Sequence, residues 1–144
     1  MSMSKIALSF LFFLRTVRFV PKVEGLMMKL MRHFPAFSKH VVVVDVFDNV
    51  QMKLNLDDLV QQHLFAHGQY EPEATAMWKY LLASSKVVVD IGANVGYYSL
   101  LTAKYGAAEI KIWSFEPMTH IYNRAKENIE LNSCAKIHLI KLAV

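Results

Sequence analysis

The sequence predicts an α/β fold: the first three strands of a doubly wound parallel sheet with their helices, preceded by a β-hairpin and N-terminal helices. Two observations predict it. A strand, a glycine-bearing turn and a helix follow one another over residues 87–105, and a strand–helix–strand pattern continues to residue 144. With 144 residues, 54% of them hydrophobic, the chain is long enough to bury a core. We expect three regions, at residues 1–39, 40–83 and 84–144.

The first region is apolar and basic. An unbroken apolar run extends from Ile6 to Leu14, and a second Met- and Leu-rich helix is predicted to end before Pro35. The run is shorter than the roughly 20 residues that span a bilayer. A helix packed on the body is the simplest interpretation; the alternatives are a basic amphipathic helix that contacts a membrane surface through residues 1–22, and a signal peptide.

Charge and cysteine content limit which partners the protein binds and in which cellular compartment it is expected. Residues 1–39 hold seven Lys and Arg side chains and one acidic residue, Glu24, whereas the rest is mildly acidic. This distribution favours a membrane surface or a protein partner, and we expect no nucleic-acid partner because no basic stripe with interleaved aromatics follows. The single Cys134 excludes an internal disulfide, which favours a cytoplasmic protein. The basic, apolar N-terminus could associate this protein with a membrane.

The second region is predicted to be a hairpin followed by a helix. Two β-rich runs flank Asp48-Asn49, and a helix is expected from Pro72 to Leu82 with Met77, Tyr80 and Leu81 along one face. His63 and His67 are four residues apart, but no third ligand of a fitting type lies nearby, so we expect no metal site. No serine or cysteine stands in a nucleophile-elbow setting, which leaves hydrolase chemistry without support.

The third region begins with a loop shaped for a small molecule. Three valines suit a central strand covered on both faces, and Asp90 closes that strand. Gly92 permits a tight turn and Gly96 a close approach of the next helix to the strand, so we expect backbone N–H groups to face a ligand. A dinucleotide fingerprint would need glycine in place of Asn94 and Tyr97, and no Gly-Lys-Ser/Thr is present. An adenosine-type cofactor without a pyrophosphate at this loop fits better.

An acidic residue at the tip of the next strand completes the pattern. Glu116 follows a strand expected over residues 109–115 and lies 24 residues beyond Gly92. A carboxylate there is placed to accept both ribose hydroxyls of a nucleoside. Pro117 and Met118 come next, and an apolar side chain there can lie against an adenine ring. We then expect a helix over residues 119–132 and a third strand within residues 135–144.

These segments resemble a known enzyme family. The stretches "VVVDIGANVGYYSLLTAKYG" and "WSFEPMTHIYNRAKENIELN" resemble S-adenosylmethionine-dependent methyltransferases, and among them the FkbM family, chiefly O-methyltransferases. The upstream "HGQYEPEAT" is similar to the G-x-Y/F-E element that precedes the cofactor loop in that family. The resemblance covers residues 59–144 and implies a Rossmann-like class I core that binds S-adenosylmethionine.

The resemblance also implies roles for individual residues. Asp90 would fix the methionine amine through backbone or water contacts, and Glu116 would hold the ribose. Met118, with Pro117, would flank the adenine, and Glu71 would touch the amino end of the cofactor. The methionine and sulfonium end would be wrapped by the turn residues Gly92, Ala93, Asn94 and Gly96. The reaction implied is methyl transfer to a hydroxyl of a small molecule or glycan.

The family pattern is incomplete here. A full catalytic domain has about seven strands, whereas this sequence ends just after the third, so no catalytic residue is nominated. We expect either that the natural gene product is longer or that this is a truncated, inactive reading frame. The alternative from another class is a non-catalytic remnant that acts as a membrane-associated or binding module. A third hypothesis, an NAD-dependent oxidoreductase, is disfavoured by Asn94 and Tyr97.

Overall fold

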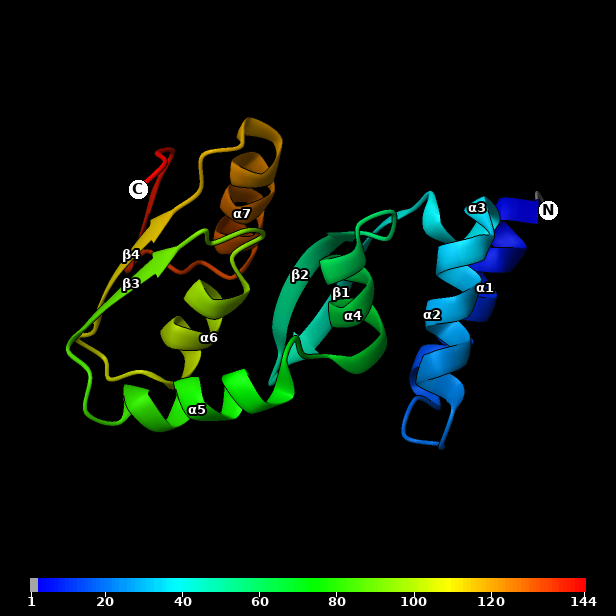
Figure 1. Ribbon diagram of the computed structural model, residues 1–144, viewed down its shortest axis with the longest axis horizontal. Helices are drawn as coiled ribbons and strands as arrows, with labels where there is room; N and C mark the ends of the chain where they lie inside the picture. The colour runs from blue at the N-terminus through cyan, green and yellow to red at the C-terminus, as the bar shows by residue number, and fades with distance from the viewer. Residues whose placement is uncertain (1–2) are drawn as a thin grey trace. The chain divides into compact units, whose positions relative to one another are not determined.

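A computed structural model describes residues 3–144, and the chain divides into two compact units, Met1–Tyr70 and Glu71–Val144 (Figure 1). Each is described by itself, and the regional boundaries expected at 39/40 and 83/84 stay predictions. The first unit contains α1 (Met3–Thr16), α2 (Val23–His33), α3 (Pro35–Ser38), β1 (Val41–Phe47), β2 (Val50–Asn55) and α4 (Leu59–His67). The second contains α5 (Pro72–Leu82), β3 (Val87–Ile91), α6 (Tyr97–Tyr105), β4 (Lys111–Phe115), α7 (Thr119–Leu131) and β5 (Ile137–Ile140).

The hairpin of the first unit forms where the sequence predicts it. β1 and β2 pair antiparallel, and the two turn residues, Asp48 and Asn49, have φ of 38° and 64°. Aspartate and asparagine tolerate this left-handed region better than most residues. Alternate side chains of both strands are buried, so one face of the hairpin packs against the rest of the unit.

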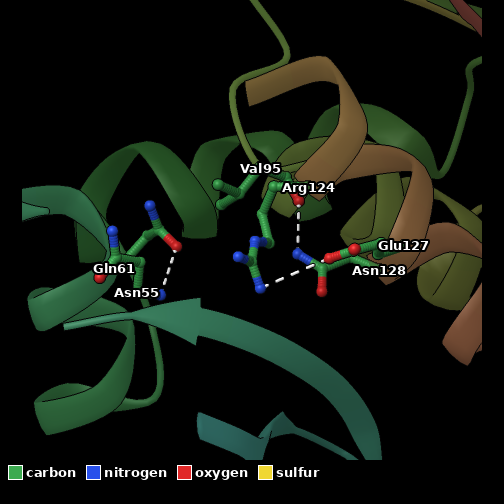
Figure 2. A network of polar contacts seen from close by, with 6 residues as sticks. All are labelled: Asn55, Gln61, Val95, Arg124, Glu127 and Asn128. Carbon is green, nitrogen blue, oxygen red and sulfur yellow. Dashed lines mark hydrogen bonds and ion pairs between the residues drawn. The ribbon is translucent and has the colours of Figure 1, made fainter. Parts of the chain in front are cut away.

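Helix α4 was not predicted, and local polar contacts define it. Asp58 caps its first turn by accepting the Gln61 N–H at 2.9 Å, and Gly68, with φ of 72°, ends it. The Asn55 N–H donates to Gln61 Oε1 at 2.7 Å, which ties the end of β2 to α4 (Figure 2). His63 and His67 stack with ring centroids 5.3 Å apart, and among the described residues no three His, Cys, Asp or Glu side chains gather as metal ligands.

A buried arginine joins α1 to the rest of the first unit. Arg15 donates to the backbone oxygens of Phe65, in the last turn of α4, and Asp45, on β1. A guanidinium at a helix C-terminus satisfies carbonyls that have no partner within the helix. Burial, and to a smaller extent the charge of Arg18, lower the pKa of Arg15 to about 10.

Within residues 3–144, no helix combines the length and the apolar character needed to cross a membrane.

The second unit holds the predicted parallel sheet. Its strand order is β3-β4-β5, with Val88 opposite Ile112 and Ile112 opposite Ile137. β3 is therefore an edge strand in this unit, and it extends to Ile91, one residue past the predicted end at Asp90. The α/β class, with an antiparallel hairpin followed by three parallel strands, is confirmed.

The prediction that β3 is covered on both faces is wrong. Val88 and Asp90 are buried, whereas Val87, Val89 and Ile91 are 52–61% exposed. The two crossovers, through α6 and α7, step in the same direction across the sheet, and right-handed connections then place both helices on the same face (Figure 1). The other face of the sheet is left without a covering element in this unit.

Helix α5 has the predicted bounds, but its expected apolar face is exposed. Met77, Tyr80 and Leu81 are 51–77% exposed. α5 contacts α6 through side-chain hydrogen bonds instead, since the Trp78 indole N–H donates to Thr102 Oγ1 at 2.8 Å. The periodicity was correct as a sign of a helix and misleading as a sign of its buried side.

Candidate functional site

Asp90 lies one position before the end of β3. Its side chain shares the buried face of the strand with Val88 and is 7% exposed. Ser99 Oγ of α6 donates to Asp90 Oδ2 at 2.5 Å and lies 2.7 Å from Ser114 Oγ of β4. Burial raises the pKa of the Asp90 carboxyl above its ordinary value; hydrogen bonds from Ser99 oppose this, and the charge of Glu116 adds to it. Asp90 thus belongs to a buried polar network on the helix-covered side of the sheet.

The turn after β3 is built on positive φ angles. Gly92, Asn94 and Gly96 have φ of 74°, 50° and 88°. Glycine adopts this region without cost, and asparagine more readily than other residues. The N–H groups of Gly92 and Ala93 both donate to the Phe115 carbonyl at 2.9 Å, and the Gly96 N–H donates to the Ala93 carbonyl at 2.9 Å. The turn is therefore fastened to the end of β4.

The remaining N–H groups of the turn are also engaged. The Asn94 N–H donates to Glu116 Oε2 at 3.0 Å, and the Val95 N–H donates to the Asn94 side-chain oxygen at 2.7 Å. All five N–H groups from residue 92 to residue 96 thus have acceptors within the chain. The expectation that this loop offers its backbone N–H groups to a ligand is not met, because the end of β4 accepts three of them and the turn itself accepts the other two.

The two glycines of the turn face different surroundings. A Cβ on Gly92 would meet no other atom within 4 Å, so this position borders open space. A Cβ on Gly96 would lie 3.7 Å from Ala125 Cβ of α7. Gly96 therefore faces α7 and not the strand as predicted, and its φ of 88°, with no shortage of space, is what favours glycine there.

Glu116 connects the turn to the segment that follows β4. Its side chain is 5% exposed, Oε2 accepts the Asn94 N–H, and Oε1 accepts the Met118 N–H at 2.9 Å. Its own N–H donates to the Ile140 carbonyl at 3.1 Å. A carboxylate oxygen has two lone pairs, so each oxygen keeps one acceptor position beyond these bonds. Glu116 thus holds both loops at the carboxyl ends of the strands.

The residues after Glu116 differ from it in exposure. Pro117 is exposed and Met118 is 52% exposed, although the Met118 N–H is bound to Glu116. An exposed thioether next to a buried carboxylate offers an apolar surface beside a polar acceptor. This pairing suits a nucleoside, whose base is flat and apolar on its faces and whose ribose carries hydroxyls.

Glu71 precedes α5 and is held near the start of α6. It has φ of 46°, and the Tyr98 hydroxyl donates to Glu71 Oε2 at 3.3 Å. Burial raises the pKa of Tyr98, so this phenol stays protonated and can donate. The structure therefore places Glu71 at the amino end of the helix that follows the glycine-bearing turn.

Sequence reasoning missed Asn128, which is fully buried on α7. Its Nδ2 group donates to the Val95 carbonyl at 2.9 Å, so it fastens α7 to the turn (Figure 2). On the same helix, Arg124 and Glu127 form an ion pair at 3.4 Å. The signal for Asn128 was an amide three residues after the buried Ala125, on the apolar stripe of an otherwise polar helix.

Ser99 and Ser114 were also missed, although both are fully buried. Each is a small polar residue within an element that reads as apolar, and that pattern marks a side chain with a buried polar partner. Together with Asp90 they form a chain of hydrogen bonds from β3 through α6 to β4.

Comparison with family models and with characterised proteins finds no match. Solved structures do match. Pyrococcus horikoshii TYW2, in complex with the S-adenosylmethionine analogue MeSAdo, aligns with a TM-score of 0.53 and 19% identity over 85% of this chain and 50% of that chain. PH0793 from P. horikoshii, a proposed transferase, gives the same values. A proposed O-methyltransferase from Klebsiella pneumoniae aligns with a TM-score of 0.46 and 22% identity over 52% of this chain and 35% of that chain.

The two P. horikoshii structures show the fold of this chain. The hairpin followed by three parallel strands with helices corresponds to part of a Rossmann-like methyltransferase structure. The chain spans half or less of the length of the structures it matches.

Proposed function

We propose that the second unit, Glu71–Val144, is the cofactor-binding part of an S-adenosylmethionine-dependent methyltransferase. One observation carries the proposal: the buried Glu116 carboxylate at the end of β4 binds the turn after β3 through the Asn94 N–H. The methyltransferase-like fold supports it. Ligands of doubly wound sheets bind outside the carboxyl ends of the strands, where these groups lie.

Residues around this edge of the sheet fit the cofactor. The free lone pairs of Glu116 would accept ribose hydroxyls, Met118 would contact the adenine, and the open space at Gly92 leaves room for a ligand. The cofactor, when bound, supplies a methyl group on a sulfonium. The other residues that would surround it are Glu71, Ala93, Asn94 and Pro117. Asp90 is buried against Ser99 of α6 and Gly96 faces α7, so both would support the turn without touching the cofactor.

We propose further that the reaction is FkbM-like O-methylation of a hydroxyl on a sugar, glycan or secondary metabolite. Methyl transfer to a hydroxyl needs an in-line approach and a base that takes the hydroxyl proton. No residue of residues 3–144 is assigned as that base. The chain spans half or less of the structures it matches, and we assign no acceptor site within it.

Isothermal titration with S-adenosylhomocysteine tests the proposal. We expect binding by the wild-type chain that is lost in Glu116→Ala and kept in Glu109→Ala, an exposed glutamate before β4. NADH, the ligand that the oxidoreductase hypothesis predicts, is titrated separately and should give no heat of binding. Binding of NADH without binding of S-adenosylhomocysteine would favour the oxidoreductase hypothesis, and binding of neither would contradict the proposed cofactor site.

A further inference from the structure

Helix α1 leaves an apolar stripe uncovered within the first unit. At 3.6 residues per turn, Met3, Ile6, Phe10 and Phe13 fall within about 80° of one another around the helix. Their side chains are 80%, 51%, 42% and 60% exposed. The helix packs into its unit through a neighbouring face, formed by the buried residues Ala7, Leu11 and Leu14. Two apolar faces on one helix are more than packing within the unit requires.

Further apolar surface is exposed in the connection after α1 and in a groove that shares residues with the stripe. In the connection after α1, Phe19 is 82% exposed and Val20 is 44% exposed. A groove of about 280 Å³ between α1 and α3 is lined only by apolar side chains, namely Met3, Ile6, Ala7, Phe10, Ala36 and Phe37. Exposed apolar surface of this extent marks a site of interaction.

The same region is strongly basic at its surface. Five basic residues of the first 39 are exposed: Lys5, Lys22, Lys29, Arg32 and Lys39. Glu24 is the single acidic residue of that segment, and its Oε2 lies 3.1 Å from His67 Nδ1. The first 39 residues therefore carry a net positive charge, which attracts anions.

We propose that α1 and the connection after it lie on an anionic phospholipid bilayer, with the stripe at the boundary of headgroups and acyl chains. An amphipathic helix with aromatic and basic residues binds a bilayer in this way, through buried apolar area and attraction to anionic lipid. A second copy of the chain would also cover the stripe, but it would bring like charges together. Charge complementarity thus selects the anionic bilayer, and this inference does not depend on the cofactor site.

Vesicle co-sedimentation of the full 144-residue chain tests the proposal. We expect binding to phosphatidylcholine vesicles that contain phosphatidylglycerol, and much weaker binding to phosphatidylcholine alone. The double variant Ile6→Ser/Phe13→Ser should bind vesicles at least about tenfold more weakly than wild type, because two exposed apolar side chains are lost. Lys5→Gln and Lys22→Gln should each weaken binding about fivefold, and added salt should act in the same direction.

Two matched controls lie in the second unit. Tyr80→Ser removes a side chain that is 77% exposed, and Lys141→Gln removes an exposed charge; both should bind vesicles as the wild type does. Circular dichroism checks that each variant folds. In Phe13→Trp, brominated lipid should quench fluorescence more than it quenches the native tryptophans, whatever the effect of the double variant.

Three outcomes would overturn the proposal. The first is equal binding to neutral and anionic vesicles. The second is an equal loss of vesicle binding in the stripe variants and in their controls. The third is a chain that does not bind vesicles but self-associates, with self-association abolished by Ile6→Ser/Phe13→Ser. The last outcome would assign the stripe to a second copy.

Discussion

Two neighbouring strands carry carboxylates near their carboxyl ends that are almost equally buried, yet the hydrogen-bond partners of the two carboxylates differ. Asp90 of β3, 7% exposed, accepts a hydrogen bond from a buried serine hydroxyl. Glu116, after β4, is 5% exposed and accepts two backbone N–H groups of the loops at the strand ends. One carboxylate belongs to the core, and the other lies at the carboxyl ends of the strands, where we propose that the cofactor binds.

The difference comes from the position of each residue relative to the end of its strand. Asp90 is within β3, so the alternation of the strand directs its side chain to the buried face. Glu116 follows the last residue of β4 and escapes that alternation. A carboxylate at a strand tip is therefore a better ribose-binding candidate when it stands just after the strand than when it stands inside it.

The largest expected effect is that of Glu116→Ala. This change leaves the N–H groups of Asn94 and Met118 without their acceptor, and we expect the free energy of unfolding to fall by about 2–3 kcal/mol. Glu116→Gln keeps a carbonyl oxygen for one of them and should lose about half as much. Urea unfolding measures both; equal stability of Glu116→Ala and wild type would show that the carboxylate does not hold the loops.

The next largest effect is that of Ser99→Ala on the core carboxylate. Removing the hydroxyl leaves buried Asp90 without its serine donor, which should lower the free energy of unfolding at pH 7 by about 1–2 kcal/mol. Ser84→Ala, at an exposed serine after α5, is the matched control. If Ser99→Ala lowered the binding free energy of S-adenosylhomocysteine by more than it lowered the free energy of unfolding, Asp90 and Ser99 would belong to the cofactor site as well as to the core.

Gly92→Ala separates the strain of the turn from the space beside it. The new Cβ meets no atom within 4 Å but is placed at φ of 74°, so we expect about 1 kcal/mol of destabilisation from backbone strain alone. Gly68→Ala in the first unit has a similar φ and also places a Cβ 2.8 Å from the Val46 carbonyl, so it should cost more. Thermal unfolding of the two variants compares them, and a larger loss in Gly92→Ala would contradict the open space.

The smallest expected effect is on pH dependence. Burial raises the pKa of Asp90 above its ordinary value of 3.8, so the folded state binds this proton more tightly than the unfolded state does. The contribution of Asp90 to stability is thus full below pH 3.8 and is lost as pH rises through the raised pKa. Asp90→Asn removes this contribution, so the stability of wild type minus that of Asp90→Asn, measured by urea unfolding, should fall as pH rises through the raised pKa. A difference that grows with pH would contradict the direction of the shift.

Much of the fold was predictable because local signals agreed with it. The turn at Asp48-Asn49, the start of α5 at Pro72 and the end of α6 before Gly106 follow from residues with strong local preferences. Helix α4 escaped prediction because its apolar residues lack a clear helical period. The uncovered face of β3 escaped as well, since the hydrophobicity of its valines carries no information on which elements cover them.

The site was predictable in its positions and less so in its contacts. Glu116, Gly92 and Met118 were nominated from their positions after each strand, and their role in a cofactor site stays a prediction. The direction of the Asp90 side chain depended on whether β3 continues one residue further, which spacing does not show. Three of the five N–H groups from residue 92 to residue 96 bind acceptors at the end of β4, which lie far away in the sequence and so beyond local sequence patterns.

The most direct test of the central claim is a ¹⁵N NMR titration of the chain with S-adenosylhomocysteine. The claim is that Glu116 and the turn after β3 form one cofactor site. We predict saturable shifts of the Asn94 and Met118 amide signals, whose N–H groups bind the Glu116 carboxylate, and none at Lys53 of the hairpin. Shifts confined to the first unit, or the absence of shifts at millimolar ligand, would contradict the claim.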